Sequence, residues 1–416
     1  MKQMVLITTD FPYGIGENFL ETEVDYYTEF DQVYIYPIRH CVGKMRAVPS
    51  NVIVHKKKKK TTITSNLCSW EIIKEIWYCV RRMGWNKIFG EMQVYRRVVD
   101  YYSRAYYEAD RIGKSLKAAG IKAKDHIVIY SYWMHLPAIV AVLLSRKYPN
   151  AKLVTRCHGY DLYEERDKDL YQPFRKLIFE KMDVIVPISN SGKKYLSERY
   201  EKIRSKIMVC RLGVINNTEN TATNAWWGKS GTLRIVSSSN LVPVKRVERI
   251  IEALSYIYNI PIEWKHFGDG AAENDLRRLS EELLRDRSNI KWQFMGRVTN
   301  QEMLDYYDKK RPHFLINTSE SEGIPVSMME AMSYSIPVIG TDVGGVGEII
   351  EDQRNGYLIN ADADGKTIAD MIRKVYDQSE QGYMAMSHYA KKTYDKRYNA
   401  KANYSKFVSI LLSMTD

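Results

Sequence analysis

The chain has 416 residues, of which 45% are hydrophobic and 27% are charged, and this composition is typical of a globular protein with two domains. The longest apolar runs, such as Ala138 to Leu144, fall far short of the roughly 18 residues that a membrane span needs, which excludes a transmembrane protein. The five cysteines lack metal-ligand spacing and indicate a reducing compartment, so we expect a cytoplasmic protein.

The net charge of +12 is distributed unevenly along the chain. Residues 1–216 contain 37 Lys and Arg against 23 Asp and Glu, a net +14, whereas the other 200 residues contain 25 against 27, a net −2. The densest stretches are Lys56 to Lys60, Arg81-Arg82 and Arg96-Arg97. Such a field attracts anionic lipid, nucleic acid or a phosphorylated acceptor, although a solvated face or a loop would also explain the lysine run.

Strand-like apolar runs alternate with amphipathic segments in the first half of the chain. We expect strands at Met4–Thr8, Gln32–Ile38, His126–Tyr130, Lys152–Arg156 and Val184–Pro187. Helices are expected at Asn18–Phe30, Glu71–Met83, Leu136–Lys147 and Ser191–Tyr200. This alternation predicts a mostly parallel sheet with helices on both faces.

A polar, irregular segment at 216–230 has the composition of a linker, and the same alternation restarts after it. Strands are expected at Arg234–Ser238, Glu263–Phe267, Lys291–Met295, Phe314–Asn317 and Pro337–Gly340, and helices at Arg249–Tyr258, Glu273–Arg285, Gln301–Asp308 and Val326–Met332. We therefore predict one domain at 1–215, a second at 231–395, and a terminal helix within 396–416 that packs back on the first domain. Two doubly wound domains bind ligands beyond the carboxyl ends of their strands.

The most informative motif follows the expected strand Phe314–Asn317. Glu322 lies in the loop after this strand, and Glu330 lies eight residues later, one to two turns into the next helix. The start of that helix offers backbone N–H groups and the positive end of its dipole, which suit a diphosphate. Gly323 permits a close backbone approach and Pro325 suits the helix start. Two carboxylates beside such an anion site can hold the hydroxyls of a ribose and of a second sugar.

This segment resembles glycosyltransferase family 4. The resemblance covers Glu322-Gly323-Ile324-Pro325 to Glu330, then Ala331-Met332-Ser333, Pro337 to Gly345, Glu348-Ile349-Ile350 and Asn355-Gly356-Tyr357-Leu358. It implies a GT-B fold, with two Rossmann-like domains facing across a cleft, and transfer that retains the anomeric configuration. By resemblance Glu322 contacts the donor sugar, Glu330 binds the ribose hydroxyls, and the backbone at Gly323, Ile324, Pro325 and Val326 meets the diphosphate.

Further matches extend the resemblance to the rest of the second half. Lys245 corresponds to the lysine that neutralises the leaving diphosphate. The family usually has an arginine five residues earlier, where this chain has Asn240, and whether Arg246 takes its place stays open. The loop with Gly268 and Gly270 resembles the nucleotide-side loop, and Arg297 follows a strand end that resembles the one near the base.

Two loops of the first half resemble the family as well. Residues 11–16, which end at Gly16, resemble its glycine-rich acceptor-side loop, a weak match by itself. The run Arg156-Cys157-His158-Gly159-Tyr160-Asp161 matches its His-Gly-x-Asp loop, which places His158 near the donor sugar.

The resemblance predicts a metal-independent hexosyltransferase without a resident cofactor. Its donor would be a UDP- or GDP-type nucleotide sugar, and its acceptor a saccharide or lipid-linked saccharide in bacterial capsule, exopolysaccharide or O-antigen synthesis. We interpret two Asp-x-Asp matches, at Asp167 and Asp362, as solvated carboxylates and not as metal ligands. The basic first half predicts peripheral binding to the anionic inner leaflet of the membrane, and no nucleic-acid module is recognisable. The alternatives are a nucleotide-sugar epimerase of the same fold and a non-catalytic, basic membrane-binding protein.

Overall fold

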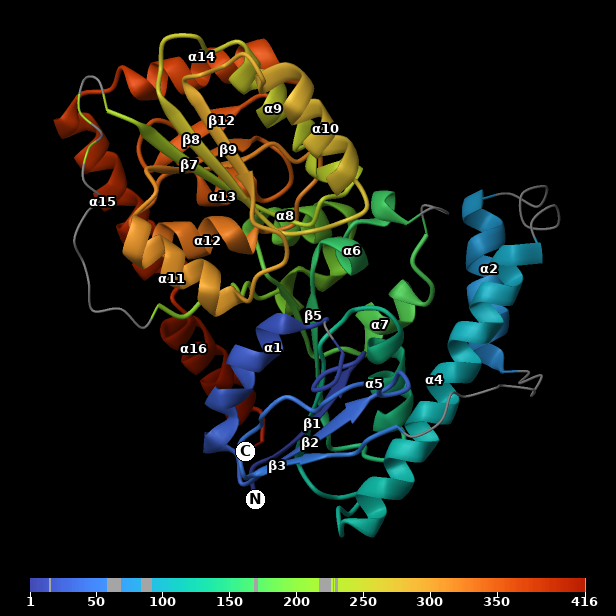
Figure 1. Ribbon diagram of the computed structural model, residues 1–416. Coiled ribbons are helices and arrows are strands. Elements are labelled where there is room, and N and C mark those ends of the chain that lie inside the picture. The colour runs from blue at the N-terminus through green and yellow to red at the C-terminus, as the bar shows by residue number, and fades with distance from the viewer. Residues whose placement is uncertain are drawn as a thin grey trace. The chain divides into compact units, whose positions relative to one another are not determined.

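The computed structural model describes residues 1–14, 16–57, 69–83, 92–167, 171–216, 226, 228 and 231–415, without the side chains of 80–83 and 92–95. It divides into two compact units (Figure 1). The N-terminal unit comprises Met1–Leu212 and Ala402–Asp416, and the C-terminal unit comprises Gly213–Lys401. Most of the expected linker lies outside the described residues, as do Lys58 to Lys60 and the side chains of Arg81 and Arg82.

The N-terminal unit is built on a six-stranded sheet in the order β3-β2-β1-β4-β5-β6, in which all pairs are parallel. The strands are β1 Gln3–Thr8, β2 Gln32–Pro37, β3 Val52–Val54, β4 Ile127–Ser131, β5 Lys152–Cys157 and β6 Val184–Pro187. Every residue of β1 and β4 is buried, because both faces of a parallel sheet are covered. The strand order reverses between β1 and β4, which places the topological switch point of this unit there.

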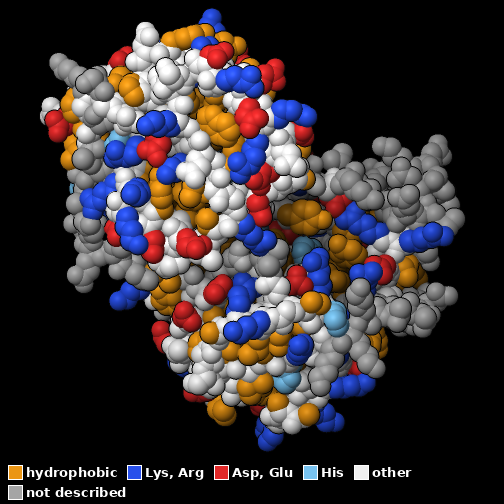
Figure 2. Space-filling model, viewed as in Figure 1, with side chains coloured by type: hydrophobic (Ala, Val, Ile, Leu, Met, Phe, Trp, Pro, Cys, Tyr) orange, Lys and Arg blue, Asp and Glu red, His pale blue; other side chains and the backbone are white. Residues whose placement is uncertain are grey.

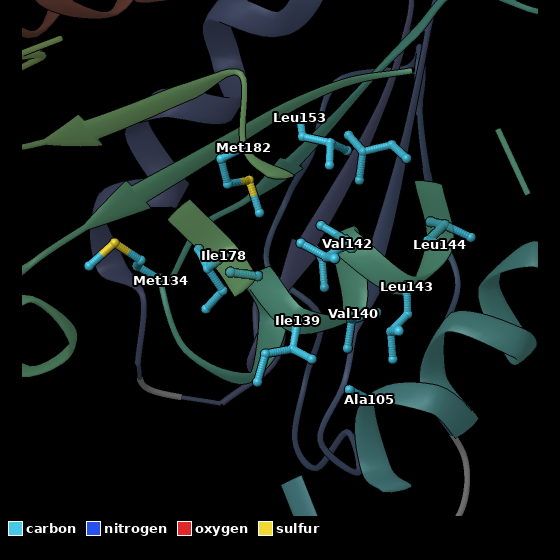
Figure 3. Close-up of a cluster of buried hydrophobic side chains, with 14 of the residues drawn as sticks. Ala105, Met134, Ile139, Val140, Val142, Leu143, Leu144, Leu153, Ile178 and Met182 are labelled. Atoms are coloured by element: carbon cyan, nitrogen blue, oxygen red, sulfur yellow. The ribbon is translucent and has the colours of Figure 1, made fainter. Parts of the chain in front are cut away.

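The helices of this unit are α1 Asn18–Glu23, α2 Trp70–Met83, α4 Met92–Ala118, α5 Leu136–Ser145, α6 Gly159–Leu162, α7 Arg175–Lys181, α8 Asn190–Arg199 and α16 Ala400–Ser413. The core is densest around α5, whose apolar side chains pack against α4 and the sheet. Figure 3 shows Ile139, Val140 and Val142 of this helix among side chains from α4, β5 and α7. A helix that is apolar all round has to lie inside the unit.

The C-terminal unit repeats the same topology in the order β12-β11-β10-β7-β8-β9, again with parallel pairs only. Its strands are β7 Leu233–Ser238, β8 Ile262–Phe267, β9 Ile290–Phe294, β10 Phe314–Asn317, β11 Val338–Thr341 and β12 Gly356–Ile359. Its helices are α9 Glu248–Ser255, α10 Glu273–Leu284, α11 Asn300–Lys310, α12 Val326–Ser333, α13 Val346–Ile349, α14 Gly365–Tyr376 and α15 Glu380–Arg397. Here the switch point lies between β7 and β10.

The terminal helix α16 packs in the N-terminal unit. Phe407, Val408 and Leu411 are fully buried in a cluster with residues of β1 and β4. The guanidinium of Arg156 lies 4.4 Å from the centre of the Phe407 ring and pairs with Glu23, and both charged side chains are fully buried. The end of the chain therefore completes the core of the domain that begins the chain.

The expected doubly wound architecture is confirmed in each unit, and the expected strands agree with the structure to within about one residue at each end. The expected helix Asn18–Phe30 is wrong in its second half, because α1 ends at Glu23 and a 3₁₀ turn spans Val24–Glu29. The short strands β3 and β12 and the 27-residue helix α4 were not predicted. In the described part of the chain, no helix is long and apolar enough to cross a bilayer.

Candidate active site

Two loops are tied together at the switch point of the C-terminal unit. One follows β7 and contains the 3₁₀ turn Pro243–Lys245; the other follows β10. The Thr318 hydroxyl donates a 2.8 Å hydrogen bond to the Arg246 carbonyl, and the Glu320 N–H donates one of 2.9 Å to the Val244 carbonyl. Because β7 and β10 are neighbours in the sheet, these bonds hold side chains from distant parts of the sequence side by side.

The structure brings Lys245 and Glu322 together in this place. The Lys245 Nζ atom lies 2.7 Å from Oε1 of Glu322, which also accepts a 2.6 Å hydrogen bond from the Ser319 hydroxyl and one of 3.2 Å from the Asn317 amide. Glu322 is 7% exposed. The lysine side chain keeps 24% of its surface exposed, so its ammonium group can reach a ligand while it is held by the carboxylate.

The loop after Glu322 leads directly into α12. Pro325 is the residue before the helix, and it forms no side-chain hydrogen bond to the first turn. Val326, at the first helical position, is half-buried. The first backbone N–H groups of a helix have no partner within the helix. The start of α12 therefore has the donors that an anion needs, next to the Lys245–Glu322 pair.

Two glycines press the loop after β11 against the same segment. A Cβ atom on Gly344, which has φ +56°, would lie 2.0 Å from the Glu322 carbonyl oxygen, and one on Gly345 would lie 2.4 Å from that of Gly323. The Gly345 N–H donates a 2.8 Å hydrogen bond to the same Gly323 carbonyl. The backbone around Gly323 and Ile324 is thus fixed by a contact that leaves no room for a side chain.

Glu330 lies further along α12 and is also buried, with 7% of its surface exposed. Its Oε1 atom accepts a 2.6 Å hydrogen bond from the amide of Asn300, the first residue of α11. Burial raises the pKa of Glu330 to about 7, and the Asn300 hydrogen bond opposes this shift. A hydroxyl donor that approached the carboxylate would replace lost hydration and favour the ionised form.

The other candidate residues of this unit are Gly268, Gly270, Arg246 and Arg297, and the first three have contacts within the unit. A Cβ on Gly268 would lie 2.0 Å from the Ser239 carbonyl oxygen, and one on Gly270 would lie 2.4 Å from that of Leu241, so both glycines pack the loop after β8 against the loop after β7. The Arg246 guanidinium donates a 2.6 Å hydrogen bond to the Ala361 carbonyl, and Arg297 is exposed. Their contacts with a ligand stay predictions.

His158 lies at the carboxyl end of β5, in the N-terminal unit. Its ring is 4.4 Å from that of Trp133 and 4.8 Å from that of Tyr132, measured between centroids. Neither ring nitrogen has a hydrogen-bond partner among the described residues. Burial, with smaller contributions from Arg156 and His135, lowers the pKa of His158 well below its usual range. The imidazole is therefore neutral at pH 7, and because both ring nitrogens are buried in this structure, its contact with a sugar stays a prediction.

At the switch point of this unit, Glu17 holds the loops after β1 and β4 together, and the sequence analysis did not identify it. Its carboxylate accepts hydrogen bonds of 2.7–2.8 Å from the N–H groups of Thr9, Asp10 and Phe11 and from the indole N–H of Trp133. Glu17 adopts φ +55° to do so, and the polarity of the neighbouring residues in the sequence does not predict this conformation. The adjacent Gly16 is exposed, and a Cβ built there has no neighbour within 4 Å.

Asp161 of the His-Gly-x-Asp motif ties the loops after β4 and β5 together, because it accepts 2.6 Å hydrogen bonds from the N–H groups of Met134 and His158. The interpretation of Asp167 as a solvated carboxylate is wrong, since it is buried and forms a two-oxygen ion pair with Arg97. Asp364 caps α14 by accepting from the Thr367 N–H. Asp169 lies outside the described residues.

Comparison with known proteins finds glycosyltransferases that are similar to this chain. Residues 225–393 match the model of the family "Glycosyl transferases group 1". This segment contains every candidate residue of the C-terminal unit. The match confirms the resemblance to glycosyltransferases, whereas the assignment to family 4 stays a prediction.

The chain is similar to N-acetyl-alpha-D-glucosaminyl L-malate synthase of Bacillus anthracis, with 23% identity over 78% of this chain and 85% of the relative. It is also similar to the amylovoran biosynthesis glycosyltransferase AmsK of Erwinia amylovora, with 24% identity over 66% and 67%. Among solved structures, Anabaena HepE in complex with UDP and glucose superposes with a TM-score of 0.63 at 14% identity, over 98% of this chain and 99% of that one.

Such structures confirm the fold class: this chain has the GT-B fold, with two doubly wound α/β units. That the strand ends of these units face one another across a cleft stays a prediction.

Proposed function

We propose that this chain is a retaining glycosyltransferase that moves a sugar from a nucleotide-diphosphate donor to a saccharide or lipid-linked saccharide acceptor in bacterial surface polysaccharide synthesis. The observation that carries the proposal is the Lys245–Glu322 pair beside the uncapped start of α12. A cation, a set of backbone donors and a second buried carboxylate at Glu330 together suit the diphosphate, sugar and ribose of one donor.

In the proposed reaction, an acceptor hydroxyl attacks the anomeric carbon from the side of the leaving group. The bond between that carbon and the diphosphate breaks, a bond to the acceptor oxygen forms, and the hydroxyl proton passes to the departing diphosphate. Lys245 and the first N–H groups of α12 stabilise the negative charge that develops, while Glu322 orients the sugar. The scheme uses no metal ion.

The relatives support the substrate class. AmsK is named for amylovoran biosynthesis, and HepE was crystallised with UDP and glucose, so a UDP-sugar is the first donor to test. We further propose that the basic N-terminal half holds the protein at the anionic inner face of the membrane, where lipid-linked acceptors are found.

The test is a screen of UDP- and GDP-sugars for acceptor-dependent release of the nucleoside diphosphate, followed by Lys245→Ala with the best donor. We expect turnover to fall about 100–1000-fold, as for loss of one transition-state donor, with an unchanged melting temperature. Lys366→Ala, on the exposed surface of α14 in the same unit, is the control and should keep wild-type turnover. Near-normal turnover in Lys245→Ala would refute the role of this lysine. Acceptor-independent formation of free nucleoside diphosphate and epimerised sugar would favour the epimerase.

A further inference from the structure

Helix α2 of the N-terminal unit has large apolar side chains on its outer face. Trp70, Ile73 and Trp77 are 64%, 37% and 55% exposed, although side chains of this size are ordinarily buried in a soluble domain. They stand at positions i, i+3 and i+7, which places them in one stripe along the helix. Lys74 is exposed in the same stripe, and its ammonium lies 5.7 Å from the centre of the Trp70 ring.

The opposite face of α2 is anchored, so the helix cannot rotate this stripe inward. Ile72 and Cys79 are buried in the core of the unit. Glu75 is also buried, and it accepts hydrogen bonds from the Tyr171 hydroxyl and the Phe174 N–H. The stripe is therefore the outer side of a helix with a fixed orientation.

The stripe lies in the most basic part of the chain. Residues 56–118, which include α2 and α4, contain 15 Lys and Arg against 6 Asp and Glu, a net +9 of the total +12. In Figure 1, α2 and α4 run side by side in opposite directions. Arg96 and Lys117 of α4 are exposed, whereas Lys57 is taken up by an ion pair with Glu108. By contrast, Figure 2 shows acidic and basic side chains interspersed over the C-terminal unit.

We propose that α2 is the membrane-docking element of this protein and that Trp70, Ile73 and Trp77 insert between the headgroups of an anionic bilayer. The inference rests on the proposed membrane association and assigns it to one helix face. Tryptophan next to lysine is typical of side chains at the boundary between headgroups and acyl chains, where the indole is partly buried and the cation meets lipid phosphates.

Charge separates a bilayer from the other candidate occupant, a second copy of this chain. Two copies that met through this stripe would bring together two segments of net charge +9, which repel one another. An anionic surface attracts the same segment, and each cation near it strengthens the binding. The proposed partner is therefore a lipid surface that carries negative charge.

The experiment measures sedimentation of the full-length protein with vesicles of phosphatidylglycerol and phosphatidylcholine, at low and high salt. We expect binding to rise with the phosphatidylglycerol fraction, and the double variant Trp70→Ser/Trp77→Ser to bind at least about tenfold more weakly at constant charge, because two large apolar side chains no longer enter the bilayer. The matched control is Tyr256→Ser/Tyr258→Ser, which removes two exposed aromatic side chains from the C-terminal unit and should bind as wild type does.

The double variant should keep the wild-type melting temperature and the wild-type turnover of the best donor with a water-soluble acceptor. These two readouts distinguish failure of the docking proposal from failure of the proposed function. Equal vesicle binding by variant and wild type would overturn the proposal, as would wild-type binding that ignores phosphatidylglycerol. A dimer in light scattering that the Trp→Ser changes abolish, without an effect on vesicle binding, would assign the stripe to a second copy instead.

Discussion

Each unit places a carboxylate at its topological switch point, after the first strand in the N-terminal unit and after the fourth strand in the C-terminal unit, and the two are used differently. At the switch point of the N-terminal unit, Glu17 bridges the loops after β1 and β4 by accepting four hydrogen bonds, three of them from backbone N–H groups. At the switch point of the C-terminal unit, Glu322 bridges the loops after β10 and β7 through the partly exposed side chain of Lys245. A carboxylate surrounded by backbone donors is committed to structure, whereas one that faces a side-chain cation can exchange that cation with a ligand.

The means of fixing the loops differ as well. The N-terminal unit uses buried charged groups such as Asp161 and the Arg156–Glu23 pair. The C-terminal unit uses glycines whose neighbours leave no room for a Cβ atom, such as Gly268 and Gly344. Substitutions that remove a charge should therefore disturb the loops of the N-terminal unit most. Substitutions that add a side chain at a glycine should disturb the loops of the C-terminal unit most.

The largest effect is expected from Gly344→Ala. The new methyl group would lie 2.0 Å from the Glu322 carbonyl oxygen, on a backbone with φ +56°, so the loop has to move. We expect the C-terminal unit to lose about 3 kcal/mol or more in its free energy of unfolding, measured by calorimetry. An unchanged melting temperature in this variant would mean that the loop after β11 does not hold Glu322 in place.

Glu17→Ala tests the corresponding site in the N-terminal unit. The change leaves three backbone N–H groups and one indole N–H without their acceptor, which should cost about 2–3 kcal/mol. The control is Glu21→Ala in helix α1, which Glu17 precedes. There the carboxylate is exposed and 3.5 Å from Arg46, and we expect a change within about 0.5 kcal/mol. Equal melting temperatures for both variants would contradict a structural role for Glu17.

Glu330→Gln tests the pKa of about 7. Because the folded-state pKa is raised above the unfolded value, Glu330 contributes stability that is fully present below about pH 4.5 and is lost as the pH rises through 7. The free energy of unfolding should therefore fall more steeply in the wild type than in the variant over this range, by about 1–3 kcal/mol in total.

The same variant tests whether Glu330 binds the ribose hydroxyls of the donor. If ribose hydroxyls bind the Glu330 carboxylate, a nucleoside diphosphate should release more protons on binding near pH 6.5 to the wild type than to Glu330→Gln, because ionisation of the diphosphate itself contributes equally to both. Calorimetric titration in two buffers of different ionisation enthalpy measures this difference. Equal proton release by both proteins would remove Glu330 from the nucleotide site.

The smallest effect on stability is expected from Gly16→Ala. The position has open space around it, so the free energy of unfolding should change by less than about 0.5 kcal/mol. The predicted role of Gly16 requires a ligand to approach its backbone, and a methyl group would block this approach. Turnover should therefore fall while the free energy of unfolding stays unchanged. Wild-type turnover in this variant would show that the resemblance of residues 11–16 carries no contact with substrate.

The sequence by itself determined the doubly wound architecture, because strands that are covered on both faces consist of continuous apolar residues, such as Met4 to Ile7 and Phe314 to Ile316. It also predicted which loop of the C-terminal half binds the donor, since Glu322, Gly323 and Glu330 lie within one short motif. The three-residue strand β3, with one buried residue, left too short a pattern to detect, and β12 was missed although β10 of the same length was found.

Only the tertiary structure decided how charged side chains are used. Lys245 and Glu322 lie 77 residues apart, and Arg97 and Asp167 lie 70 apart, yet each pair forms one ion pair. Asp167 reads as a surface carboxylate in the sequence because its partner, Arg97, lies on helix α4, far from it along the chain. Polarity is a local property of the chain, whereas the partner of a charge is set by which strands and helices the fold brings together.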